Sequence, residues 1–289
     1  MHYEGNIIRP PSEADSILLQ VCVSCPHNTC AFCGAYLDER FRVKDDKTVF
    51  ADIDYAASRL TGMRRVFLCD GDAMILPMER LSRILGRIRE RIPRVSRTAS
   101  YASARSVAAK SPGDLARLRE MGLAMVYMGL ESGDDALLER MNKKASVASN
   151  LEAARKVREA GMKLSVTVIT GLAGTQGWER HARLTGEALT AMRPDHVAAL
   201  SLIPVPGTPL WEDIRTGRFE LHGARGMTLE LRTLLQHVNL ERGLFLADHA
   251  SNHVPLKLRL PRDKEHGLRL LDAALDGRLP FKPERSRGL

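Results

Sequence analysis

The chain has 289 residues, of which 44% are hydrophobic and 27% charged, and its formal net charge is +8. No apolar run approaches the roughly 20 residues needed to cross a bilayer, so we expect no membrane association. The first six residues lack the basic, apolar and small-residue order of a signal peptide, and four of the five cysteines are clustered. This pattern indicates a metal site in a reducing compartment rather than a disulfide framework, so we expect a cytoplasmic protein.

Short apolar runs alternate with amphipathic stretches along the first 215 residues. The runs predicted to be strands are Ser16–Val23, Arg65–Cys69, Val95–Tyr101, Ala124–Leu130, Leu164–Thr170 and His196–Leu202. Helices are predicted between them, for example Met78–Ile92, whose apolar residues recur at helical spacing. A helix, a glycine stop and then a continuous apolar strand are typical of a parallel sheet buried on both faces. Six such units indicate an α/β fold, either an open doubly wound sheet or a partial (β/α)6 TIM-like barrel, and we take the barrel.

The pattern changes after residue 215. We predict a helix over Thr228–Gly243, an irregular segment over Leu244–Pro261 and a final helix over Asp263–Leu275. The chain is thus expected to comprise a barrel over 1–215 and a helical and irregular extension over 216–289 that packs on it. The extension is too short for a separate core of any strength.

The most specific feature lies between residues 22 and 34, where Cys25, Cys30 and Cys33 follow Cys22 closely. Three thiolates can hold three irons of a [4Fe–4S] cluster and leave the fourth iron open to a small molecule. The alternative is a closed site with Cys22 as fourth ligand, either a structural zinc or an electron-transfer iron–sulfur centre. Strand alternation sends Cys22 and Cys25 to opposite faces, which favours Cys22 as a small buried hydrophobe.

The Cys-x4-Cys-x2-Cys run, with Phe32 before its last cysteine, resembles the cluster loop of radical S-adenosylmethionine (radical SAM) enzymes. The commoner spacing in that family is Cys-x3-Cys-x2-Cys, and an uncharacterised subgroup shares the longer one. The resemblance covers about residues 16–210. It implies a [4Fe–4S] cluster on Cys25, Cys30 and Cys33, with S-adenosylmethionine (SAM) on the open iron. It also implies reductive cleavage of SAM, hydrogen abstraction from a substrate, and a flavodoxin or ferredoxin-type electron donor.

The same resemblance implies a SAM site at the carboxyl ends of the strands. Asp70-Gly71-Asp72 is similar to the Gly-Gly-Glu motif that holds the methionyl amino group, although a tight turn is the alternative. Arg105 could bind the SAM carboxylate, with Lys143 as a rival, and both could instead form surface ion pairs. The cofactor-binding residues expected in this way are Phe32, Asp70, Gly71, Asp72, Arg105, Glu131, Gly171 and Pro204.

Polar residues in the extension are the candidates for substrate contact. His249, Asn252 and Arg262 would face the substrate if this segment covers the barrel mouth, and would otherwise cap helices or pair on the surface. The segment Glu79–Arg97 carries seven Arg and two Glu, which could meet an anionic tetrapyrrole or nucleic acid, or could be a solvated helix face. Because no RNA-binding signature accompanies it, we expect a small-molecule substrate rather than RNA.

Overall fold

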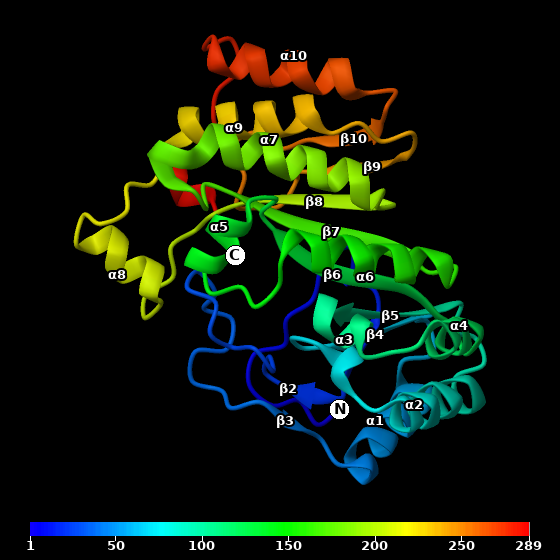
Figure 1. Ribbon diagram of the computed structural model, residues 1–289. Coiled ribbons are helices and arrows are strands. Elements are labelled where there is room, and N and C mark those ends of the chain that lie inside the picture. The colour runs from blue at the N-terminus through cyan, green and yellow to red at the C-terminus, as the bar shows by residue number, and fades with distance from the viewer. Residues whose placement is uncertain (289) are drawn as a thin grey trace. The chain divides into compact units, whose positions relative to one another are not determined.

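The computed structural model describes residues 1–288, which fall into two compact units. Unit 1 comprises Met1–Asn28, Ala35–Met128 and Glu152–Leu164. Unit 2 comprises Thr29–Gly34, Gly129–Leu151 and the chain from Ser165 onward. Figure 1 shows both units, and each is described by itself below.

Unit 1 is built on parallel strands. Neighbouring strands run in the order β1 (Ile17–Gln20), β4 (Arg65–Cys69), β5 (Arg97–Ala102) and β6 (Leu123–Glu131), and β6 continues into unit 2. A separate antiparallel pair joins β2 (Cys22–Val23) to β3 (Arg42–Val43). Because the four main strands are parallel, their carboxyl ends share one edge, and Asp70–Asp72 and Ser103 follow two of them there.

The helices of unit 1 lie between these strands. They are α1 (Asp46–Arg59), α2 (Met78–Arg91), α3 (Ala104–Ala108) and α4 (Pro112–Glu120), with short 3₁₀ turns η1 (Pro11–Glu13) and η2 (Ala73–Ile75). In Figure 1, α1 and α2 lie side by side. The apolar stripe of α2 is buried, as its helical spacing predicted, through Leu81, Ile84, Leu85 and Ile88. An edge-to-face group of Phe67, Tyr101 and Tyr127 fills part of the core.

Unit 2 continues the α/β pattern. Its strands run in the order β7 (Lys163–Thr170), β8 (His196–Ser201), β9 (Gly243–Leu246) and β10 (Lys257–Leu260), with only the last pair antiparallel. Its helices are α5 (Asp135–Arg140), α6 (Val147–Glu159), α7 (Gly174–Met192), α8 (Pro209–Arg215), α9 (Ala224–His237) and α10 (Lys264–Leu275), with η3 at Glu284–Ser286. The second half of α6 belongs to unit 1. Figure 1 shows α9 between α7 and α10, and it packs against both.

The six predicted strands all form, although the first is interrupted at Val21 so that Cys22–Val23 pairs separately with β3. The prediction that 244–261 is irregular holds for 247–256 but is wrong at both ends, where β9 and β10 form. β9 pairs parallel to β8 from Leu244 onward. Its apolar residues alternate towards the core, and Phe245 and Leu258 are buried on adjacent strands. The domain boundary at residue 215 stays a prediction.

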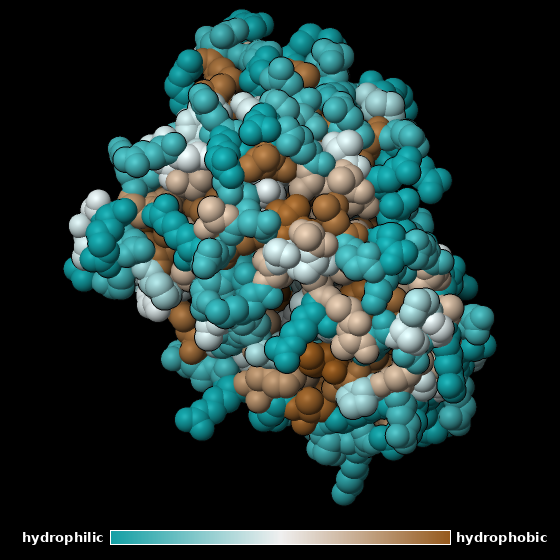
Figure 2. Space-filling view, viewed as in Figure 1, coloured by the Kyte–Doolittle hydropathy of each residue, from teal (hydrophilic) through white to brown (hydrophobic). Residues whose placement is uncertain are grey.

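The basic segment of α2 is largely neutralised within unit 1. Asp46 of α1 binds Arg80 and Arg83 at 2.8 and 2.6 Å, and Asp54 binds Arg87 and Arg91 at 2.9 and 2.7 Å. Figure 2 shows a mainly hydrophilic face with smaller apolar areas between the polar side chains. Within residues 1–288, no helix has the length and apolar character that crossing a bilayer requires.

Candidate functional site

The five cysteines divide into two chemical groups. Cys25, Cys30 and Cys33 are partly exposed, whereas Cys22 and Cys69 are fully buried. Burial raises the pKa of the Cys22 thiol to about 12 and raises that of Cys69 well above its ordinary value. A thiol must lose its proton to bind a metal, so burial disfavours Cys22 as a fourth ligand. The three accessible thiols are those predicted to hold the cluster.

The donor set therefore fits a three-cysteine cluster by its chemistry. Cys25 belongs to unit 1, and Cys30 and Cys33 belong to unit 2. Among residues 1–288, no three His, Cys, Asp or Glu side chains are gathered in the arrangement of a metal site. The fit thus depends on the number, spacing and accessibility of the thiols, together with the packing of the loop around them.

In unit 2, the loop segment that carries Cys30 and Cys33 is anchored at two points. The backbone N–H of Ala31 donates to the carbonyl of Met141, and the carbonyl of Ala31 accepts from Leu210, both at 2.9 Å. Asn142, which has a positive φ of 51°, donates its side-chain N–H to the carbonyl of Thr29 at 2.8 Å. These contacts fix the backbone between the cysteines without using a thiol.

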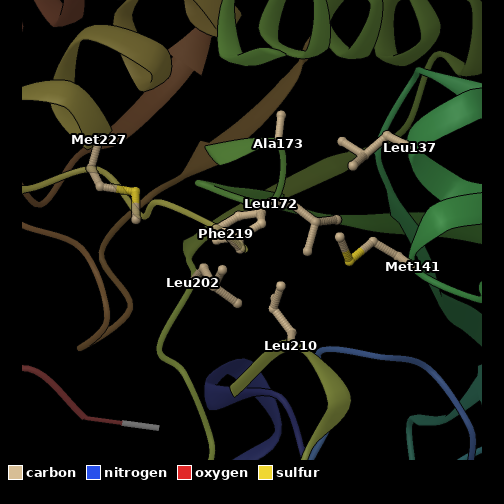
Figure 3. Close-up of a cluster of buried hydrophobic side chains, with 8 residues drawn as sticks. All are labelled: Leu137, Met141, Leu172, Ala173, Leu202, Leu210, Phe219 and Met227. Atoms are coloured by element: carbon tan, nitrogen blue, oxygen red, sulfur yellow. The ribbon is translucent and has the colours of Figure 1, made fainter. Parts of the chain in front are cut away.

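Phe32 lies against a buried apolar cluster in unit 2, partly buried itself. Figure 3 shows how the side chains of that cluster converge from α5, the turn after β7, the residue after β8, α8 with the segment that follows it, and α9. Its members are Leu137, Met141, Leu172, Ala173, Leu202, Leu210, Phe219 and Met227. The predicted role of Phe32 and its packing role are compatible, because one face of the ring can contact the core while the other stays accessible.

The turn after β4 is a close-packed support for Cys25. A Cβ atom on Gly71 would collide with the Cα and Cβ of Cys25, so only glycine fits there. Asp70 is fully buried, with a φ of 70°, and accepts hydrogen bonds from Gln20 and Tyr36. Burial raises its pKa. Its side chain is therefore engaged inside unit 1.

The side chain of Asp72 is also engaged. Its carboxylate accepts from the hydroxyls of Ser103 and Ser106 at 2.6 and 2.8 Å and from the backbone N–H of Ser103, at the start of α3. Burial raises its pKa, while these hydrogen bonds act in the opposite sense. Asp72 thus links the turn after β4 to α3. Arg105, the second residue of α3, is exposed.

Glu131 ends β6 in the left-handed region, with a φ of 65°. Its Oε1 accepts from Lys143 Nζ at 2.9 Å, and its Oε2 is buried with no hydrogen-bond partner among the described residues. A side chain on Gly129 would collide with this carboxylate. A buried, half-satisfied carboxylate beside a lysine is an arrangement that a polar ligand would complete.

Gly171, after β7, has a φ of 85°, and a Cβ there would collide with Met227. The positive φ therefore accounts for glycine at this position, because the flexible end of Met227 could move aside for a side chain. Pro204 is partly exposed, and the next residue, Val205, packs so closely on Gly34 that no side chain fits there. The segment after β8 thus supports the end of the cysteine loop.

The candidates in the extension have mostly internal partners. Asn252 is buried, donates to the carbonyl of Ala199 at 2.9 Å and accepts from Ser201 at 2.9 Å. His249 bonds Ser251 at 2.9 Å, and burial lowers its pKa, so the ring is neutral at pH 7. Arg262 is exposed and paired with Asp263 at 2.7 Å. The structure gives no support for a substrate role of Arg262.

A buried polar chain in unit 2 was not among the residues predicted from the sequence. It runs from Ser132 through His181 of α7 to Glu230 of α9 and the backbone N–H of Gly171. The available signal was a charged residue, Glu230, on the apolar stripe of a helix beside Met227, Leu231 and Leu234. A charge at such a position requires a buried partner.

Comparison with known proteins identifies the class. The family model of the Radical SAM superfamily matches residues 19–184, more than half of the chain. The chain therefore belongs to the radical SAM superfamily, a family of enzymes whose cofactors are a [4Fe–4S] cluster and SAM. The family, the enzyme class and both cofactors that the sequence resemblance implied are confirmed.

The chain is similar to several members of this superfamily. It is 26% identical over 216 residues to the anaerobic magnesium-protoporphyrin IX monomethyl ester cyclase of Cereibacter sphaeroides, covering 73% of this chain. The chain spans about one third (34%) of the length of that curated relative.

Solved structures share the fold. Methylornithine synthase has a TM-score of 0.55 at 16% identity, covering 77% of this chain and 63% of its own. Coproporphyrinogen III oxidase from Escherichia coli has a TM-score of 0.54 at 15% identity, and the match covers 76% of this chain and 50% of the oxidase chain. A radical SAM methyltransferase from Kitasatospora setae was solved with cobalamin and a [4Fe–4S] cluster. It has a TM-score of 0.55 at 17% identity, and the match covers 69% of this chain and 39% of the methyltransferase chain. The predicted α/β, partial-barrel class is confirmed at the level of fold.

Proposed function

We propose that Cys25, Cys30 and Cys33 bind the [4Fe–4S] cluster and that Glu131 and Lys143 form part of the SAM site. The observation that carries this proposal is the division of the cysteines, since the three partly exposed thiols lie in the loop and the two others are buried. When bound, the cluster and SAM supply reductive cleavage of SAM and abstraction of a hydrogen atom from substrate. The chain's own residues hold the loop, orient SAM and exclude water.

The polar groups of the proposed SAM site have complementary chemistry. Lys143 provides a cation for the SAM carboxylate, and the unpaired Oε2 of Glu131 can accept from a hydroxyl or amino group. The turn of Asp70–Asp72 contributes backbone groups, because both of its carboxylates are already hydrogen-bonded. Gly171 and Pro204 remain predicted contacts of the adenosine portion, and Arg105 remains the alternative to Lys143 as the predicted contact of the SAM carboxylate.

We propose a small-molecule substrate rather than RNA, and a flavodoxin or ferredoxin-type protein as electron donor. The ion pairs between α1 and α2 support the first point, because they neutralise the most basic segment. The same ion pairs leave this segment with little free positive charge to bind an anionic substrate. The names of the Cereibacter cyclase and the Escherichia coli oxidase make a tetrapyrrole the substrate class to test first. The cytoplasmic location stays a prediction.

The test is anaerobic reconstitution with iron and sulfide, reduction with dithionite, and detection of 5′-deoxyadenosine after SAM is added. We expect wild-type protein to produce it and Cys30→Ala to lose both the cluster and the product. Cys22→Ala is the matched control and should retain both. Loss of the metal in Cys22→Ala would instead indicate a four-ligand site and overturn the proposal.

A negative result with fully loaded wild-type protein needs one further measurement. An enzyme that cleaves SAM only when substrate is bound would give no product, yet SAM would still change the electron paramagnetic resonance spectrum of the reduced cluster. An unchanged spectrum would contradict the proposed SAM site.

A further inference from the structure

A fully buried polar chain connects two strand ends in unit 2. His181 and Glu230 are both 0% exposed. The Nδ1 of His181 lies 2.8 Å from the hydroxyl of Ser132, and its Nε2 lies 3.1 Å from the carbonyl of Ile169 and 3.3 Å from Glu230 Oε1. Glu230 Oε1 also accepts the backbone N–H of Gly171 at 2.8 Å.

These partners determine the tautomer of His181. A carbonyl oxygen can only accept, so the proton is on Nε2, and Nδ1 accepts from the hydroxyl of Ser132. The same hydroxyl accepts the N–H of Asp134 at 2.9 Å, and Thr185 Oγ1 accepts the N–H of Gly133 at 2.8 Å. Two α7 side chains therefore hold the turn that follows Glu131.

Glu230 holds the backbone at the end of β7, as the α7 side chains hold the turn after β6. It reaches from α9 to the first residue after β7, where Gly171 has its positive φ. Its second oxygen, Oε2, is buried with no hydrogen-bond partner among the described residues. Burying a carboxyl group with one unsatisfied oxygen is costly, and an apolar residue would fit α9 better if packing were its only task.

We propose that His181 and Glu230 are positioning residues that set the backbone at the ends of β6 and β7 for SAM binding. The inference rests on the proposed SAM site, because Glu131 lies directly before the turn held by His181 and Gly171 receives the bond from Glu230. Neither side chain is expected to touch SAM, since both are fully buried in the absence of ligand.

The first readout is hydrogen exchange of the protein without cluster or SAM, followed by mass spectrometry of peptides that contain Gly171. Glu230→Met removes the acceptor at similar size and should speed exchange there by about tenfold or more, whereas Glu230→Gln keeps an acceptor oxygen and should restore protection. Glu187→Met, an exposed substitution on α7, is the control and should leave this exchange unchanged.

The second readout is SAM affinity of the reconstituted proteins by anaerobic titration calorimetry. We expect about tenfold weaker binding in Glu230→Met and near wild-type binding in Glu230→Gln. Equal exchange and affinity in wild type and Glu230→Met would overturn the proposal, and so would failure of Glu230→Gln to differ from Glu230→Met.

Two outcomes separate this inference from the proposed function. If wild-type protein binds no SAM, the proposed function and the SAM part of the inference fail together, and exchange alone decides whether Glu230 positions Gly171. If Glu230→Met does not fold, Ser132→Ala tests the other end. It should speed exchange at Asp134 and weaken SAM binding, and unchanged values would contradict the proposal.

Discussion

Burial decides the chemistry of individual residues in this enzyme. It raises the pKa of Glu230 from its ordinary 4.5 to about 8 and lowers that of His181 from 6.5 to about 4. Both changes have one cause, since a low-dielectric site disfavours the charged form of each group. The pair is thus neutral at pH 7, although the two side chains lie within ion-pair distance.

This neutral pair predicts how stability depends on pH. The folded protein keeps the proton on Glu230 up to about pH 8, whereas the unfolded chain releases it near 4.5, so this contribution is lost as pH rises towards 8. His181 affects the unfolding free energy mainly below pH 6.5, where the unfolded chain takes up a proton that the folded protein does not. Between pH 6.5 and 8, Glu230 alone should therefore lower the unfolding free energy by about 2 kcal/mol.

Urea unfolding of wild type and Glu230→Gln at pH 6.5, 7.25 and 8 measures this effect. We expect the difference between the two proteins to change by about 2 kcal/mol across the series, with the variant less sensitive to pH. A difference that stays constant would show that Glu230 is ionised beside a neutral His181 throughout this pH range, and would contradict the neutral pair.

At the scale of elements, the C-terminal extension is more ordered than its sequence suggested. It adds β9 and β10 to the strands of unit 2, and the tail after α10 returns to the end of β8. The largely buried guanidinium of Arg287 donates to the carbonyls of Leu202 and Ser251 at 2.9 and 2.6 Å. The tail therefore holds the loop that carries His249 and Asn252.

Arg287→Ala should release this tail. Loss of charge-assisted hydrogen bonds to two carbonyls is expected to lower the unfolding free energy by about 1–3 kcal/mol and to speed hydrogen exchange over 248–254. Arg285→Ala, at an exposed neighbouring position, is the control and should change neither quantity. Hydrogen exchange over 248–254 as slow in Arg287→Ala as in wild type would show that the loop is stable without the tail.

At the scale of the whole molecule, the net charge of +8 overstates how basic the surface of α2 is. Each of two α1 carboxylates binds two arginines of α2, so that segment offers few free guanidinium groups to a polyanion. Proteins bind the phosphates of nucleic acids through free cationic side chains, and the affinity falls steeply as the salt concentration rises. Electrostatics thus support a small-molecule substrate over RNA.

RNA binding by wild type should therefore be weak and should vanish near 0.2 M salt in a filter-binding or anisotropy assay. Asp54→Asn frees Arg91 and leaves Glu90 as the acidic partner of Arg87, and it should tighten binding about two- to threefold at low salt. Asp15→Asn raises the net charge equally but frees only Arg65, so it should have a smaller effect. Saturable wild-type binding that survives 0.2 M salt would contradict the small-molecule proposal.

The parts of the fold that follow local rules were predictable. Six strands and the buried face of α2 follow from hydrophobic periodicity. β9 and β10 were missed because each is four residues long and the segment between them contains two histidines and a proline. The pairing of β9 with β8 is a long-range contact that no local pattern encodes.

The sequence by itself determined the family, the cofactors and the three thiols proposed to hold the cluster, because the spacing of those thiols is a local chemical requirement. Only the tertiary structure decided which polar side chains remain available to ligands. It engages Asp72 with α3 and Asn252 with β8, leaves Glu131 half satisfied, and joins His181 to Glu230 across 49 positions of sequence. These outcomes depend on burial and on partners distant in sequence, since a polar group buried on folding must find its hydrogen bonds wherever the chain brings them.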